Sequence, residues 1–186
     1  EHMELPILET ERLRLRKITK DDAEDMFRYT CNEVVAKHVT WEKHKSLKDT
    51  RAFIEFVLDR YTNNKLAPWG IELKETKHII GTIDFVQWDQ NHHFAEIGYA
   101  LSHLHWGKGL MPEAANALLK YGFETMNLER IEAKCFAENT NSERVMQKIG
   151  MQYEGVLRKR MYIKGTFRDN KVYSILKDEY VKREHV

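Results

Sequence analysis

Two adjoining segments decide the fold of this chain: Phe94-Ala95-Glu96-Ile97-Gly98-Tyr99-Ala100-Leu101 and His105-Trp106-Gly107-Lys108-Gly109-Leu110-Met111-Pro112-Glu113. The first segment alternates between two sets of side chains, which is the pattern of a β-strand. A glycine within that strand, Gly98, predicts a bulge or a ligand that lies close to the backbone. The second segment is a glycine-rich turn that leads into a helix, where free backbone N–H groups can bind a phosphate.

Two common phosphate-binding motifs do not fit the turn. A Walker-type loop needs Lys-Ser or Lys-Thr after its last glycine, whereas Leu110 and Met111 follow Gly109 here. A dinucleotide fingerprint needs a third glycine, and position 112 is proline. Gly-x-Gly alone also describes a tight loop without a ligand. Whether this turn binds an anion therefore has to be judged from the surrounding sequence.

A second motif, which begins at Ala133, indicates that the turn binds a ligand. It reads Ala-Lys-Cys-Phe-Ala-Glu-Asn-Thr-Asn-Ser-Glu-Arg-Val-Met-Gln-Lys-Ile-Gly-Met-Gln-Tyr-Glu-Gly. Together with the strand and the turn, it resembles the GNAT superfamily of acyl-CoA-dependent N-acetyltransferases, and most closely its RimJ/RimL branch, whose named members acetylate the N-termini of ribosomal proteins. The resemblance implies an α+β fold with a mixed, mostly antiparallel sheet, splayed between its fourth and fifth strands and flanked by about four helices.

Length and composition are those of one soluble domain. The 186 residues are 42% hydrophobic and 32% charged, with a formal net charge of +1, so the charge balance gives no argument for nucleic acid as a partner. No apolar run is long enough to span a bilayer. Two cysteines, Cys31 and Cys135, are too few for a disulfide framework and predict a cytoplasmic protein. We expect a single domain over residues 1–186, with residues 1–3 a possible cloning remnant.

Periodicity predicts strands and helices that alternate along the chain. We expect strands at 12–16, 69–73, 79–88, 94–101 and 131–136, and two C-terminal strands that turn at Gly165. Helices are expected from Lys20 to about Tyr29, after an N-cap at Ser46, after Gly109, and from Ser142 to Ile149. An interleaved order of this kind is typical of an α+β domain.

Glu96 is the first candidate catalytic residue. It shares a strand face with Gly98 and Ala100, whose small side chains leave room for a substrate. A carboxylate in this place can act as a general base that receives a proton from an amine, directly or through water. The resemblance supports that role, because histone acetyltransferases of the superfamily carry a catalytic glutamate in the matching context. The alternative is a structural salt bridge.

Ser142 is the second candidate catalytic residue. The resemblance places Asn139 and Ser142 at a turn beside the pantetheine arm and thiol of CoA, where the Ser142 hydroxyl could donate a proton to the departing thiolate. Many GNAT enzymes use a tyrosine four residues later, and here that residue is Met146. The alternative is that Ser142 is only the N-cap of its helix.

The resemblance also identifies a CoA-binding set. Backbone donors of the turn are expected to bind the pyrophosphate, although the family's Arg or Gln three residues before the first glycine is Leu104 here. Trp106 is expected to pack, and Lys108 to face solvent. The full cofactor-binding set is Tyr99, Ala100, Leu101, His105, Trp106, Gly107, Lys108, Gly109, Leu110, Met111, Asn139 and Ser142.

No metal site is expected from the histidines, because His92, His93, His103 and His105 lack the spacing of a zinc site. Two tryptophans near the expected acceptor side have different interpretations. We expect Trp69 to pack in the core, whereas Trp41 could either pack or stack on a substrate.

The resemblance therefore implies an acetyl-CoA-dependent N-acetyltransferase that transfers its acetyl group directly to a primary amine in a ternary complex. The acceptor could be a protein N-terminus, a polyamine, an aminoglycoside or an amino-acid conjugate. A non-catalytic acyl-CoA-binding protein is the alternative of another class. The expected partners are acetyl-CoA and an amine, with no nucleic acid, membrane or metal, in a monomer or homodimer.

Overall fold

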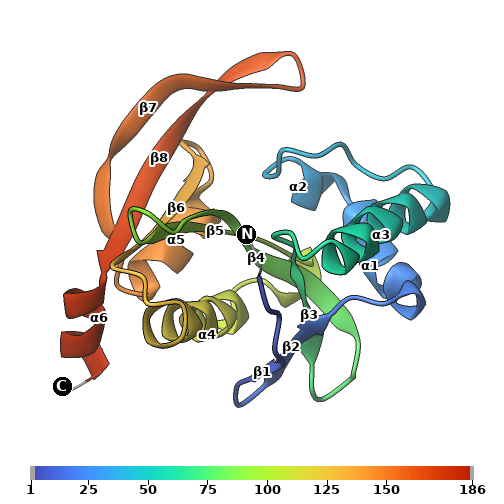
Figure 1. The fold of residues 1–186 in the computed structure, drawn as a ribbon. Coiled ribbons are helices and arrows are strands. Elements are labelled where there is room, and N and C mark those ends of the chain that lie inside the picture. The colour runs from blue at the N-terminus through green and yellow to red at the C-terminus, as the bar shows by residue number, and fades with distance from the viewer. Residues whose placement is uncertain (1–2, 185–186) are drawn as a thin grey trace. The chain divides into compact units, whose positions relative to one another are not determined.

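The computed structural model describes residues 3–184, so the expected remnant at residues 1 and 2 lies outside the described residues. Met3 is buried among the core side chains. Eight strands form one sheet in the order β1-β2-β3-β4-β5-β6-β8-β7 (Figure 1). The strands are β1 (Leu8–Glu9), β2 (Leu13–Lys17), β3 (Trp69–Leu73), β4 (Ile79–Asp89), β5 (Phe94–Leu101), β6 (Arg130–Phe136), β7 (Gln152–Ile163) and β8 (Thr166–Leu176).

Helices lie between the strands and at the end of the described chain. They are α1 (Ala23–Thr30), α2 (Glu33–Ala36), α3 (Leu47–Thr62), α4 (Leu110–Glu124), α5 (Thr140–Lys148) and α6 (Lys177–Glu184), with 3-10 turns η1 (Lys20–Asp22) and η2 (His103–His105). Only β5 and β6 pair in parallel among the registers that the structure gives for residues 3–184. The expected α+β class with a mixed sheet is therefore confirmed.

The chain divides into two compact units, each built from two segments. Unit 1 contains residues 1–85 and 99–117, and unit 2 contains residues 86–98 and 118–186. The expectation of a single domain remains a prediction. In the described part of the chain, no helix is long and apolar enough to cross a membrane.

Unit 1 has a core between its first helices and its strands. Met26 and Tyr29 of α1 pack with Ile54 and Val57 of α3, and Trp106 lies against the same cluster. Trp69 is fully buried, which confirms its expected packing role, and its indole N–H donates to the Pro6 carbonyl at 2.8 Å. Trp41 also packs against this core, with its ring 5.5 Å from that of His44.

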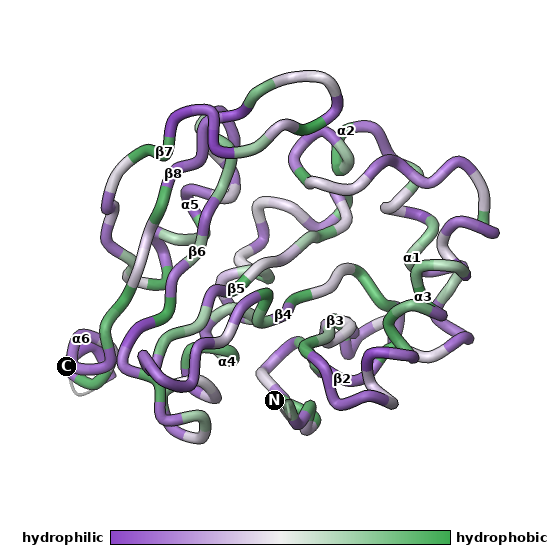
Figure 2. Tube along the Cα trace, turned by 45° about the horizontal axis from the view of Figure 1, so that its top comes forward, coloured by the Kyte–Doolittle hydropathy of each residue, from purple (hydrophilic) through white to green (hydrophobic). Residues whose placement is uncertain are grey.

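Unit 2 is organised by β6, which pairs with β5 on one side and β8 on the other. The β5 register runs from Phe94 opposite Arg130 to Ile97 opposite Ala133. The strands themselves continue to Leu101 and Phe136. The splay that the family resemblance implies remains a prediction. Figure 2 shows hydrophilic and hydrophobic stretches alternating along β7 and β8, which form a long antiparallel pair.

Most expected elements agree with the structure to within two residues, with three differences. Strand β1 was not expected, nor were the helices α2 and α6, of which α2 spans only one turn. Ser46 holds the expected N-cap position of α3, although its side chain makes no capping hydrogen bond within the described residues. Finally, α5 starts at Thr140 rather than Ser142, because the carboxamide of Asn139 caps it.

Candidate active site

The turn before α4 has the backbone shape that its glycines predict. Gly107 and Gly109 have φ values of 74° and 76°, a region that residues with a side chain rarely adopt. A Cβ atom at Gly107 would meet nothing within 4 Å. The requirement for glycine at 107 therefore comes from backbone conformation rather than from crowding by the protein.

Backbone N–H groups at the start of this turn are already used. The N–H of His105 donates to the Ser102 carbonyl at 3.0 Å, and that of Trp106 donates to His103 at 3.4 Å. These two donors therefore have acceptors within η2, and a role of Trp106 in binding CoA stays a prediction. Burial, with Lys108 and His103 nearby, lowers the pKa of His105 and so disfavours its charged form.

The following N–H groups are different. Within residues 3–184, the structure gives no acceptor to the N–H groups of Gly107, Lys108, Gly109, Leu110 or Met111. Pro112 has no N–H, and the N–H of Glu113 returns to Gly109 at 3.2 Å. Five successive donors at a helix N-terminus, approached through two glycines, fit a phosphate group. We call residues 107–111 the anion cradle.

A side-chain network braces the anion cradle from the N-terminal segment. The Arg12 guanidinium donates to the Lys108 carbonyl at 2.9 Å and to the Glu113 carboxylate at 2.7 Å. Glu113 also accepts from the Thr10 hydroxyl and, at 2.9 Å, from the Arg12 backbone N–H. Burial alone would raise the pKa of Glu113, but these hydrogen bonds outweigh it and hold the pKa below its ordinary value.

This bracing was not expected from the sequence. Arg12 lies in the bend just before β2, and 101 positions separate it from Glu113. The available signal was weak: a glutamate in the first turn of a helix normally indicates only a favourable interaction with the helix dipole.

The last residues of β5 belong to the same unit as the anion cradle. Leu101 accepts a hydrogen bond from the Trp106 indole N–H at 2.9 Å, so Trp106 connects the strand end to the turn. Gly81 of β4 also lies against this segment, because a Cβ there would be 2.3 Å from the Ala100 carbonyl oxygen. Any larger residue at 81 would displace this part of β5.

Glu96 lies in unit 2 and forms an ion pair with Lys134 of β6. Their Oε1 and Nζ atoms are 3.1 Å apart, and the two side chains are 17% and 22% exposed. The salt bridge expected as the structural alternative for Glu96 is therefore present. A role of Glu96 as general base stays a prediction, because its carboxylate is still partly accessible to a proton donor.

Asn139 and Ser142 are brought together at the start of α5. The Asn139 side-chain oxygen accepts the Ser142 backbone N–H at 3.1 Å, which makes Asn139 the N-cap. The expected capping role of Ser142 is therefore wrong, since Ser142 lies inside the first helical turn. Met146, at the position of the usual tyrosine, is fully buried.

Behind this turn lies a polar cluster that was not expected from the sequence. Glu143 accepts hydrogen bonds from the Tyr173 hydroxyl and, at 3.0 Å, from Lys171. Burial and the Glu143 carboxylate raise the pKa of Tyr173 to about 12. Burial also raises the pKa of Cys135 to about 11, so its thiol is not a nucleophile at neutral pH.

The candidate residues thus fall into two groups. Residues 99–101 and 105–111 lie in unit 1, whereas Glu96, Asn139 and Ser142 lie in unit 2. Lys108 is exposed, as expected. Within residues 3–184, no group of three or more His, Cys, Asp or Glu side chains could hold a metal ion.

Comparison with known proteins agrees with the two motif blocks. Residues 12–152 match the family described as Acetyltransferase (GNAT) domain. The chain is 42% identical over 172 residues to the uncharacterized N-acetyltransferase YoaA of Bacillus subtilis, covering 92% of this chain and 97% of that protein. A crystal structure of a GNAT-family acetyltransferase from Bacillus anthracis superposes with a TM-score of 0.83 at 34% identity, covering 94% of this chain and 100% of that one.

More distant relatives differ in the acceptor that their names give. The spermidine N(1)-acetyltransferase of Vibrio cholerae and the ribosomal-protein-serine acetyltransferase of Escherichia coli are each 23% identical to this chain, over 92% and 91% of its length. The self-immunity acetyltransferase MccE, solved in complex with acetyl-CoA and AMP, superposes with a TM-score of 0.80 at 27% identity over 90% of the chain. The chain belongs to the GNAT family of acetyltransferases and is an N-acetyltransferase.

Proposed function

We propose that this N-acetyltransferase uses acetyl-CoA to acetylate the N-terminal amine of a polypeptide, by direct attack in a ternary complex. The anion cradle is the observation that supports acetyl-CoA as the cosubstrate. Its five successive N–H groups have no acceptor within residues 3–184. They would hold the CoA pyrophosphate. The chain's likeness to MccE, solved with acetyl-CoA, supports the same cosubstrate.

Acetyl-CoA supplies an activated acetyl thioester, so an attacking amine becomes an amide and the CoA thiol is released. In our proposal, Glu96 receives the proton that the ammonium group must lose, and Lys134 orients its carboxylate. Ser142 would pass its hydroxyl proton to the departing sulfur and regain a proton from the nitrogen, which loses its second proton as the amide forms. Asn139 holds the turn that presents Ser142. Tyr99, Ala100 and Leu101 would provide backbone contacts to the acyl and pantetheine groups.

An N-terminal amine suits this set of groups because its pKa is near 8. A substantial fraction of the amine is then already neutral at physiological pH. One partly exposed carboxylate is enough to deprotonate the ammonium form that remains. Polyamine acetylation is the second candidate, favoured by the likeness to the spermidine enzyme.

The test is a CoA-thiol release assay with three acceptor classes at equal concentration: N-terminal peptides, spermidine and an aminoglycoside. We expect turnover with peptides that carry a free N-terminus, and none after that terminus is blocked. Turnover with spermidine but not with peptides would contradict the proposed acceptor and identify a polyamine instead.

A further inference from the structure

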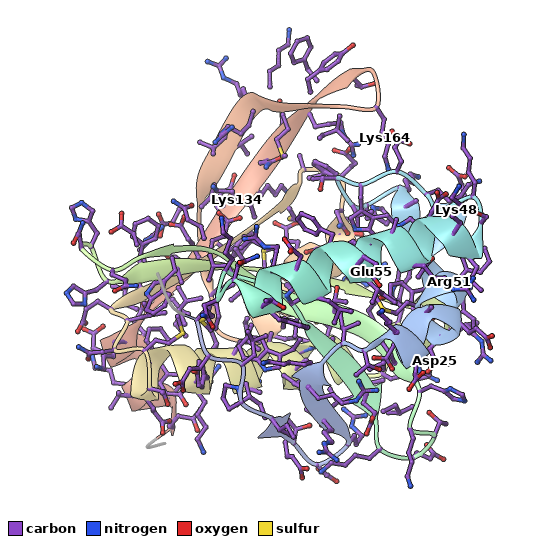
Figure 3. The ribbon with its side chains drawn as sticks, turned by 45° about the vertical axis from the view of Figure 1, so that its right-hand side comes forward. Asp25, Lys48, Arg51, Glu55, Lys134 and Lys164 are labelled. Carbon is purple, nitrogen blue, oxygen red and sulfur yellow. The ribbon has the colours of Figure 1, made fainter. Side chains whose placement is uncertain are left out.

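A long arm of unit 2 carries charge that the proposed chemistry does not use. The arm consists of β7 and β8 with their connecting turn, residues 152–176. It contains six Lys and Arg residues but only two acidic ones, although the whole chain has a net charge of +1. β7 is the last strand of the sheet order; nine of its twelve residues are exposed and none is buried. Figure 3 shows side chains around the tip of the arm, where Lys164 is labelled.

The pairing of β7 with β8 is interrupted at three consecutive cations. Leu157 pairs with Asn170 and Met161 with Arg168, so Arg158, Lys159 and Arg160 lie opposite the single residue Asp169. We call these three residues the basic bulge. The Asp169 carboxylate accepts the Lys159 backbone N–H at 2.6 Å, and Lys159 has a φ of 49°. The bulge is therefore held in place by its backbone, and its three side chains are exposed. Bulges of this kind re-aim side chains, often beside active sites.

Two other cations of the arm, Arg168 and Lys171, have acidic partners, which the basic bulge lacks among the described residues. Arg168 pairs with Glu138 and lies 3.9 Å from the centre of the Phe136 ring, and Lys171 pairs with Glu143. For the three bulge residues, the structure gives no acidic partner within residues 3–184. Three adjacent unneutralised cations attract a polyanionic ligand.

Two exposed aromatic rings lie on the arm near the bulge. Tyr162 and Phe167 pair across the strands, with ring centroids 4.9 Å apart, and they are 64% and 59% exposed. The Lys159 ammonium lies 5.9 Å from the Phe167 ring centre. Cations on an edge strand can serve merely to prevent aggregation. Exposed aromatic side chains do not serve that purpose, but together with arginine they are typical of protein-binding surfaces.

The bulge is also connected to the proposed reaction site. Its anchor, Asp169, accepts the Ala137 backbone N–H through its carbonyl at 2.9 Å. Asn139 and Ser142 follow within five residues of Ala137 on the same turn. A ligand bound along the bulge would therefore contact an element that is hydrogen-bonded to this turn.

We propose that the basic bulge and the Tyr162–Phe167 pair bind an acidic segment of the polypeptide acceptor, a few residues beyond its N-terminal amine. This inference rests on the proposed function. The bulge repels a polyamine, because both carry positive charge. A second copy of the arm would bring two sets of cations together and is disfavoured for the same reason. Nucleic acid shares the required negative charge, and the experiment separates it from an acidic peptide.

The test compares the Arg158→Glu/Arg160→Glu variant with a matched control, Lys120→Glu/Lys182→Glu, which changes the net charge equally at two exposed helix positions. Acceptors are peptides with the same first two residues, followed by a segment rich in Asp and Glu or by its Asn and Gln equivalent. We expect the bulge variant to raise KM for the acidic peptide about tenfold and to change that for the neutral peptide less than about twofold. The control should leave both values unchanged, and about 0.5 M salt should remove the difference.

Direct binding provides a second measurement that does not depend on turnover. An acidic peptide with a blocked N-terminus should bind the wild type and lose affinity only in the bulge variant. Equal KM values for acidic and neutral peptides would overturn the inference while leaving the proposed function intact. Tight RNA binding that the bulge variant abolishes, without selectivity among peptides, would also overturn it. Absence of turnover with every peptide would instead overturn the proposed function.

Discussion

The anion cradle of unit 1 and the proposed catalytic residues of unit 2, Glu96 and Ser142, are built in opposite ways. The cradle is mostly backbone: two glycines at positive φ and five N–H groups without acceptors within residues 3–184, braced by one arginine–glutamate pair. The catalytic residues act through side chains: Glu96 is paired with Lys134, and Ser142 lies in the turn that the Asn139 carboxamide caps. Backbone conformation follows from local residue types, whereas the properties of a side chain depend on its partners.

This difference has a chemical consequence. A pyrophosphate needs fixed N–H dipoles and no proton transfer, so a rigid backbone suffices. Amine acylation needs groups that gain and lose protons, so it depends on side chains whose partners control them. We therefore expect substitutions in the cradle to change CoA affinity and substitutions at Glu96 and Ser142 to change turnover.

The largest expected effect is at Glu96. If its carboxylate is the general base, Glu96→Gln should lower turnover by roughly 10²–10⁴-fold at neutral pH. The loss should shrink as the pH rises through about 8, because more of the N-terminal amine is then neutral. Full pH–rate profiles of both proteins measure this. Lys134→Met is the control: a Glu96 that serves only the ion pair would make both variants lose stability alike while turnover per folded molecule is preserved.

The second effect concerns the cradle. Gly109→Val forces a β-branched residue to a φ of 76°, a conformation that costs about 1–2 kcal/mol for residues with a Cβ. We expect CoA to bind about tenfold more weakly by calorimetry. Gly165→Val is the matched control, since Gly165 has a φ of 80° and open space around it in the turn of the arm. It should lower the melting temperature but leave CoA affinity unchanged. Unchanged affinity in folded Gly109→Val would refute the cradle.

The third effect separates capping from chemistry at the start of α5. Asn139→Ala should reduce the free energy of unfolding by about 1 kcal/mol, whereas Asn139→Asp, which keeps the acceptor oxygen, should not. Ser142→Ala should lower turnover per folded molecule without altering acetyl-CoA affinity. Denaturant titrations alongside kinetics measure both. Unaltered turnover in Ser142→Ala would assign protonation of the thiolate to solvent.

The smallest effect concerns the brace of the cradle. Because the pKa of Glu113 lies below its ordinary value, its ionised form contributes stability above about pH 4.3. That contribution is lost as the pH falls through the lowered value. Glu113→Gln should therefore cost about 1 kcal/mol or less at pH 7, since Arg12 is partly exposed, and nothing at the acid limit. Stability measured by denaturant from pH 7 to pH 2 would show the two proteins converging, and a constant difference would contradict this assignment.

The strands and the glycine turn were predictable because their signals are local. Alternating side chains at residues 94–101 predicted β5 with its correct bounds, and two glycines before a helical pattern predicted the turn. The error at Ser142 was also local in origin, since Asn139 and Ser142 are both good N-cap residues. Only the observed helix start at Thr140 decides between them.

By itself, the sequence determined the α+β class, the order of the elements, the glycine turn and the family to which the chain belongs. The tertiary structure alone decided that Arg12 braces Glu113, that Glu96 pairs with Lys134, and that three cations form a bulge opposite Asp169. The physical reason is one of range. Periodicity and φ preferences act over a few neighbouring residues, whereas an ion pair or a strand register joins residues that only folding brings together.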